Sequence, residues 1–67
     1  MQLTVNGNTR QSAADTRTAA DLLGELNIPR ERVAVVINEN VVRRADLENT
    51  PLNEGDVIEI ITMVGGG

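Results

Sequence analysis

The predicted sheet is built around the sequence Val57-Ile58-Glu59-Ile60-Ile61-Thr62-Met63-Val64-Gly65-Gly66-Gly67. Val, Ile and Thr dominate its first part, and these β-branched residues suit a half-buried strand. Three glycines then follow, and a run of glycines is typical of a flexible segment. The sequence therefore predicts a folded domain over residues 1–64 and a flexible glycine tail over residues 65–67. The functional question is what a Gly67 carboxylate at the end of such a tail is for.

Alternation along this strand predicts its two faces. Glu59 is its one charged residue and should face solvent, which turns Ile58 and Ile60 toward the core. A second segment, residues 33–37, is nearly continuous in apolar residues and reads as a central strand covered on both faces. The outward positions of the two strands predict an apolar partner-docking surface beside the tail, made of Ala34, Val36, Val57, Ile61 and Met63. The alternative is that this end of the chain frays and its apolar residues have no role.

The first half of the chain predicts a hairpin followed by a helix. Residues 2–5 alternate, residues 6–8 supply an Asn-Gly-Asn turn, and residues 9–13 return as a partner strand. Thr18 and Asp21 have the spacing of a helix cap, and the apolar face of the helix then recurs at helical spacing. Asn27 and Pro29 end it. The predicted core contains Leu3, Val5, Leu22, Leu23, Leu26, Val35, Ile37, Leu52, Ile58 and Ile60.

The remaining elements complete an α+β fold. Residues 41–42 form a short strand, residues 46–50 one helical turn that carries Leu47 inward, and residues 51–56 a turn into the final strand. The order predicts a mixed sheet of four to five strands with one helix across one face. With the first and last strands parallel at its centre, this is the β-grasp, or ubiquitin-like, roll.

Composition excludes several functions. The 67 residues are enough for one small domain, and they include no Cys and no His to supply zinc ligands, thiol nucleophiles or a general base. We therefore expect no metal site and no enzymatic activity. The net charge of −4 and the lack of aromatic residues argue against nucleic acid binding. Without a basic leader or a membrane-length apolar run, we expect a cytoplasmic protein that does not bind membranes and is a monomer when free.

With this order of elements the sequence resembles the ThiS/MoaD family of ubiquitin-like sulfur carriers, most closely the carriers of thiamine biosynthesis. The resemblance covers the whole chain. It rests on Val35-Val36-Ile37-Asn38, on Val41-Val42-Arg43 after a turn, and on residues 52–60, Leu-Asn-Glu-Gly-Asp-Val-Ile-Glu-Ile, which lead to the glycines. The sequence departs from the family pattern in having three terminal glycines where two suffice, and it lacks the aromatic ring that some relatives carry on the partner-facing surface.

The resemblance implies that Gly67 is the covalent acceptor and that Gly65 and Gly66 thread a channel of the partner. In such carriers an activating enzyme of the ubiquitin-activating kind (ThiF- or MoeB-like) adenylates the terminal carboxylate with ATP. A sulfur donor then converts it to a thiocarboxylate, which gives up its sulfur, here most closely for thiazole formation with a thiazole synthase (ThiG-like). The carrier binds no cofactor of its own and catalyses nothing.

Three other functions remain open from the sequence. The small subunit of molybdopterin synthase also ends in Gly-Gly and carries a thiocarboxylate, although such subunits tend to be longer. A β-grasp module that binds its partner without covalent chemistry, by strand addition or surface docking, is a second possibility. Conjugation to proteins in the manner of ubiquitin is a third, because it uses the same kind of tail.

Overall fold

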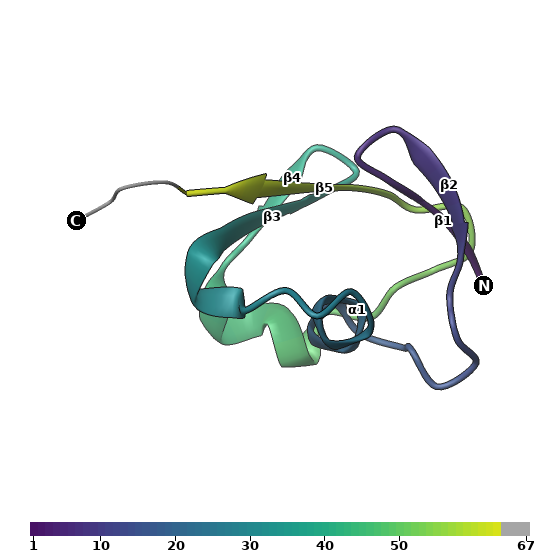
Figure 1. Cartoon of the computed structure of the whole chain (residues 1–67), viewed down its shortest axis with the longest axis horizontal. Coiled ribbons are helices and arrows are strands. Elements are labelled where there is room, and N and C mark those ends of the chain that lie inside the picture. The colour runs from purple at the N-terminus through teal and green to yellow at the C-terminus, as the bar shows by residue number, and fades with distance from the viewer. Residues whose placement is uncertain (64–67) are drawn as a thin grey trace.

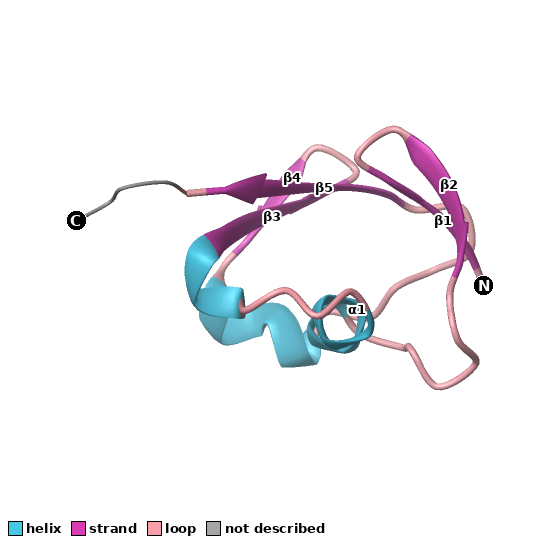
Figure 2. Cartoon of the chain, viewed as in Figure 1, coloured by secondary structure: helices cyan, strands magenta, loops and turns pink. Residues whose placement is uncertain are grey.

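The computed structural model of the protein describes residues 1–63, which form one five-stranded sheet with a single α-helix across one face (Figures 1 and 2). The strand order is β2-β1-β5-β3-β4, with β1 and β5 parallel and every other pair of neighbours antiparallel. The predicted α+β class, mixed sheet and parallel central pair are confirmed. The elements are β1 (Gln2–Val5), β2 (Asn8–Gln11), α1 (Ala19–Glu25), β3 (Val33–Ile37), β4 (Asn40–Val42) and β5 (Val57–Thr62), with 3-10 helices at Arg30–Arg32 and Arg44–Asn49.

The opening hairpin turns at Asn6 and Gly7, which have φ values of +50° and +83°. Two residues with positive φ match the right-handed twist of the flanking strands, and Asn-Gly is the sequence that tolerates this turn best. Val5 is paired directly with Asn8. The return strand therefore begins one residue earlier than predicted and ends at Gln11.

Helix α1 begins with the predicted cap. Thr18 Oγ1 accepts from the Asp21 amide at 3.2 Å, and Asp21 Oδ2 accepts in return from the amides of Arg17 and Thr18, both at 3.0 Å. These backbone donors, Arg17 first, hold the pKa of Asp21 below its ordinary value. The helix ends at Glu25, and Asn27 at φ +59° lets the Ile28 amide return to Leu23 O at 2.9 Å.

The core lies between α1 and the facing side of the sheet. Most of the predicted core residues are buried, while Val5 and Leu26 are half-buried at its border. Residues outside the predicted list complete it. They are Val33 and Ala19, and also Leu47, which is 2% exposed because the 3-10 helix Arg44–Asn49 carries it inward as expected.

Strand β3 is an interior strand and not an edge strand, as predicted, but the prediction that both of its faces are covered is wrong. Strand β5 occupies the centre, and β3 lies between β5 and β4. Along β3 the inward side chains of Val33, Val35 and Ile37 are buried, whereas Ala34 and Val36 are half-buried. The described part of the chain covers the sheet with one layer only, so an unbroken apolar run here does not mean two covered faces.

Glu25, the last residue of α1, connects the segment between β2 and α1 to the helix. Its carboxylate accepts from Thr16 Oγ1 at 2.7 Å and from the Ala13 amide at 3.0 Å, and it forms an ion pair with Arg10 of β2. The three donors come from two different segments. The Glu25 carboxylate therefore connects the hairpin, the loop and the helix.

Acid is expected to weaken the fold partly through Glu25. The hydrogen bonds from Thr16 and Ala13, together with Arg10, lower the pKa of Glu25 from 4.5 to about 2. A depressed folded-state pKa means that this contribution to the free energy of unfolding is complete above about pH 4.5 and is lost as the pH falls toward 2. Glu25→Gln is therefore expected to be less stable than the parent at neutral pH and to lose less stability on acidification.

Thermal unfolding of parent and variant at several pH values measures this difference. Glu39→Gln is the matched control, because Glu39 is exposed and its carboxylate makes no hydrogen bond within residues 1–63. It should keep the parental pH dependence. Equal acid sensitivity in all three chains would rule out the role assigned to Glu25.

Candidate functional site

Strand β5 positions the candidate site, because it is the last element that the structure describes and the predicted acceptor follows it in the sequence. It lies at the centre of the sheet, paired with β1 on one side and with β3 on the other (Figure 1). Gly65, Gly66 and Gly67 lie outside the described residues. The prediction that they carry and thread the reactive carboxylate therefore stays a prediction.

Asn38 fixes the start of β5 on the β3 side. Its backbone amide donates to Val57 O at 2.8 Å, and its side-chain Oδ1 accepts from the Val57 backbone amide at 3.0 Å. Its Nδ2 donates to Asp56 Oδ1 at 2.9 Å, while Asp56 Oδ2 accepts from the Asn53 amide at 2.8 Å. Backbone and side chain together set where the strand begins.

Asn6 performs the same task on the β1 side. Its backbone amide donates to Ile58 O at 2.9 Å, and its side-chain Oδ1 accepts from the Ile60 backbone amide at 2.8 Å. The sequence placed Asn6 in the hairpin turn and Asn38 at the end of the motif Val35-Val36-Ile37-Asn38, and neither was predicted to contact the final strand. The available signal was that each follows a predicted strand in a turn that requires positive φ, where Asn keeps a side chain that Gly lacks.

The outward face of the sheet carries an apolar strip, which we call the outer strip and define as Val41, Val57, Ile61 and Met63. Their side chains are 73%, 49%, 51% and 51% exposed, and they are the large apolar side chains that the described chain leaves in solvent. Monomeric domains rarely gather such residues on one face without a partner. Val57, Ile61 and Met63 are exposed, as their predicted orientation requires, while their role in docking stays a prediction.

The register explains how the strip is assembled. Ala34 of β3 pairs with Ile61, and Val36 pairs with Val41 of β4 on its other side. Paired residues point to the same face, so all four belong to the outward face. Ala34 and Val36 lie on β3, between the neighbouring strands β5 and β4, which partly cover them. They therefore contribute less exposed surface to the strip than expected. Val41, the most exposed of the set, was missed because only the two longer strands were used to predict this surface.

The outward face also carries negative charge. Glu59 is exposed on β5 between Val57 and Ile61, and a hollow of about 350 Å³ beside it is lined by Asn38, Glu39, Val57 and Glu59. Two carboxylates at the border of an apolar strip favour a partner that presents basic groups around an apolar contact.

Residues 1–63 bring together no group of three or more His, Cys, Asp or Glu side chains that could hold a metal ion. None of the helices in this part of the chain is long and apolar enough to cross a membrane.

The parallel central pair, the single helix and the apolar outward face define the class of the protein, a ubiquitin-like β-grasp domain. The model of the ThiS family matches residues 3–67. The chain belongs to the ThiS family. Its fold is similar to that of a crystallised thiamine biosynthesis protein (ThiS) from Geobacter metallireducens, with a TM-score of 0.84, 32% identity and full coverage of both chains.

Two relatives differ in how much of them the chain covers. A sulfur carrier protein ThiS from Thermus thermophilus is 30% identical over 63 residues, which cover 94% of this chain and 95% of the relative. A thiazole synthase from Paramagnetospirillum magneticum is 37% identical over 67 residues, which cover this whole chain but only 20% of that protein. A segment similar to this chain is therefore joined to a much longer thiazole synthase polypeptide.

Proposed function

We propose that the chain is a sulfur carrier protein of thiamine biosynthesis and that Gly67 is its acceptor. The observation that carries the proposal is the match to the ThiS family from residue 3 through residue 67, which includes the three glycines. Relatives of nearly the same length are sulfur carrier proteins, and the fold neighbour is a thiamine biosynthesis protein. The chain acts as a carrier and not as a catalyst.

The chemistry of this proposal needs a carboxylate that reaches another protein's active site. The Gly67 carboxylate attacks the α-phosphate of ATP, and pyrophosphate leaves. Sulfur at the oxidation level of sulfide, supplied by a donor, then adds to the carbonyl carbon, and AMP leaves to give the thiocarboxylate. Glycine suits this role because, without Cβ, the tail fits a narrow channel in extended form and its carbonyl is open to attack.

The proposed function requires two protein partners. The first is an adenylating enzyme of the ubiquitin-activating kind, which supplies the ATP site that this chain does not need to contain. The second is a thiazole synthase, which takes the sulfur. The relative in which a carrier-like segment is joined to a thiazole synthase supports this second partner, because one polypeptide keeps the two parts together.

The enzyme that accepts the sulfur distinguishes this proposal from the alternative of a molybdopterin synthase subunit. Thiocarboxylated chain would be mixed either with a thiazole synthase or with the large subunit of molybdopterin synthase, and its loss of sulfur followed by mass. We expect discharge in the presence of the thiazole synthase and its substrates only. Discharge to the molybdopterin enzyme alone would favour the alternative.

Docking is expected to use the outer strip. Ile61→Asp and Met63→Asp should each weaken binding to the adenylating enzyme by roughly tenfold or more, because the contact would bury an unpaired charge. Both side chains are half exposed in the free chain, so the fold should persist. Binding is measured by titration calorimetry.

Ala14→Asp is the matched control for these two variants. It adds the same charge at an exposed position between β2 and α1, away from the outer strip. It should bind as the parent does. Equal weakening by all three substitutions would point to net charge as the cause and would remove the assignment of the docking surface.

A further inference from the structure

Strand β5 extends well beyond its neighbour β1. The register between the two strands contains only the pairs Thr4 with Val57 and Val5 with Ile58, whereas β3 is paired with β5 from Ile58 through Thr62. Strand β1 ends at Val5 because the hairpin turns away from β5 at Asn6. The sheet therefore has a step, and the second half of β5 has no strand beside it on the β1 side among residues 1–63.

The backbone groups at this step point to the open side. Along β5, Asp56 O and Ile58 O accept from Thr4 and Asn6, and the Ile60 amide is held by Asn6 Oδ1. Alternation then directs the Ile60 carbonyl and both backbone groups of Thr62 to the same side. The register with β1 has ended there, and no residue in the described range is hydrogen-bonded to these three groups.

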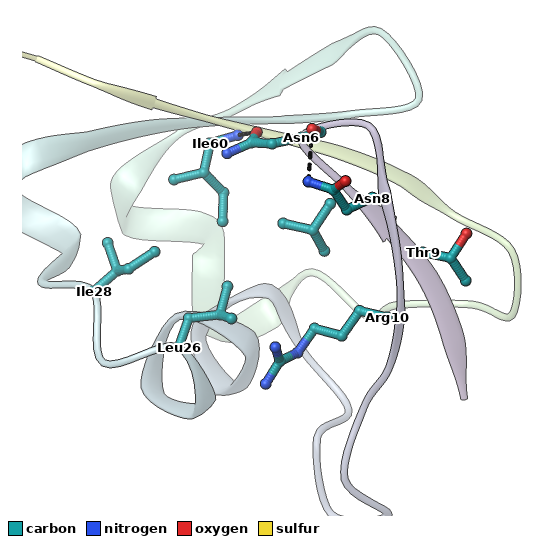
Figure 3. A pocket seen from close by; sticks show the side chains of 8 residues that line it. Asn6, Asn8, Thr9, Arg10, Leu26, Ile28 and Ile60 are labelled. Carbon is teal, nitrogen blue, oxygen red and sulfur yellow. Dashed lines mark hydrogen bonds between the residues drawn. The ribbon is translucent and has the colours of Figure 1, made fainter.

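A hollow opens next to the step, and we call it the hairpin hollow. It has a volume of about 340 Å³, and Figure 3 shows Leu26 and Ile28 on one side of it and Asn8 of the hairpin on the other, with Ile60 and Asn6 next to each other between them. Val5 completes its apolar lining. Arg10 is the only charged residue among those that line it, and its guanidinium is paired with Glu25.

We propose that the open edge of β5 and the hairpin hollow form a strand-addition site. It would take an extended peptide segment of the enzyme that receives the C-terminal residues, with an aliphatic side chain of that segment in the hollow. This inference rests on the proposed carrier function and adds to it a second contact, separate from the outer strip.

The chemistry of the edge identifies the occupant. The unpaired groups of Ile60 and Thr62 recur at the spacing of a strand, about 6.6 Å for two residues, which an extended backbone matches with its own amides and carbonyls. The apolar hollow favours an aliphatic side chain beside that backbone. On β5, Ile61 of the outer strip lies between Ile60 and Thr62, and Met63 follows Thr62 directly, so a protein docked on the strip lies beside this edge.

Thr62→Pro tests the edge directly. Proline removes the Thr62 amide hydrogen and places its ring on the open side, while the bond from the Met63 amide to Arg32 O, 2.8 Å long, is left in place. The fold should therefore persist, which far-UV circular dichroism checks. Thr62→Val is the matched control, because it keeps the amide and the shape of the side chain.

Affinities for the adenylating enzyme and for a thiazole synthase are measured with parent, Thr62→Pro and Thr62→Val chains. We expect Thr62→Pro to lose roughly tenfold or more in affinity for at least one enzyme, since a backbone hydrogen bond is lost and the edge is blocked, and Thr62→Val to bind as the parent does. Parental affinity of Thr62→Pro for both enzymes would overturn strand addition and leave the carrier function intact. Failure of the parent chain to bind either enzyme would overturn both.

Amide hydrogen exchange gives an independent result. The Thr62 amide should exchange rapidly in the isolated chain and become protected in the complex with the enzyme whose affinity the proline reduces. An unprotected Thr62 amide in both complexes would overturn the proposal. Protection in the isolated chain that increases with its concentration would identify a second copy as the occupant and would also overturn it.

Discussion

Replacing Leu23 by alanine is expected to lower the free energy of unfolding by about 2 to 4 kcal/mol. Leu23 is 2% exposed and lies on the face of α1 that packs against the sheet, so the substitution leaves a cavity between the helix and the sheet. A domain of this size has only about 3 to 10 kcal/mol of total stability. The thermal midpoint should therefore fall by more than about 10 °C.

Far-UV circular dichroism is the measurement, because the sequence contains no aromatic residue to report by fluorescence. Val41→Ala is the matched control. It also removes methyl groups from a branched side chain, but Val41 is 73% exposed, so its midpoint should stay close to that of the parent. An unchanged midpoint for Leu23→Ala would mean that this face of α1 does not pack as the structure shows.

Periodicity made most of the fold predictable from sequence. The alternation around Glu59 assigned Ile58 and Ile60 to the core, and the structure buries both. The Asn-Gly turn and the Thr18 cap are local signals, formed by residues within a few positions of each other, and both were found in place. Such features depend on interactions between residues that are close in the sequence, so they can be predicted from one sequence alone.

What could not be predicted depends on polar contacts between distant segments. The bond from the Ile60 amide to Asn6 joins residues 54 positions apart, and the bond from Asn38 to Asp56 spans 18. Glu25 resembled a surface carboxylate because its position on the helix faces away from the apolar stripe. Only the three-dimensional arrangement shows which donors reach each of these side chains.

The candidate site was predictable in part. Strand alternation identified the outward apolar residues of β5, but the exposure of Val41 depends on its pairing with Val36, which a sequence does not specify. The step in the sheet depends on where β1 ends relative to β5. That offset follows from the register of a parallel pair whose strands lie more than fifty residues apart in the chain.

Extending the chain by one alanine after Gly67 is expected to abolish adenylation. The proposed nucleophile is the Gly67 carboxylate, and the extension converts it into an amide and presents a crowded carboxylate one residue further along. Exchange of pyrophosphate into ATP, catalysed by the adenylating enzyme in the presence of the chain, measures this step. We expect no exchange above background.

Deleting one glycine is the matched control for the extension. It changes the length of the tail by one residue as well, but the shortened chain still ends in two glycines, which the resemblance to sulfur carriers implies is sufficient. It should support exchange. Full activity of the alanine-extended chain would show that the carboxylate of residue 67 is not the acceptor.

Intact mass tests the central claim most directly. The 67-residue chain is incubated with the adenylating enzyme, ATP and a sulfur donor, then weighed and fragmented. A sulfur carrier gains the difference between one sulfur and one oxygen atom, only when ATP is present, with the whole gain on Gly67. An unchanged mass with an enzyme that loads a known carrier under the same conditions, or a gain on any other residue, would contradict the account.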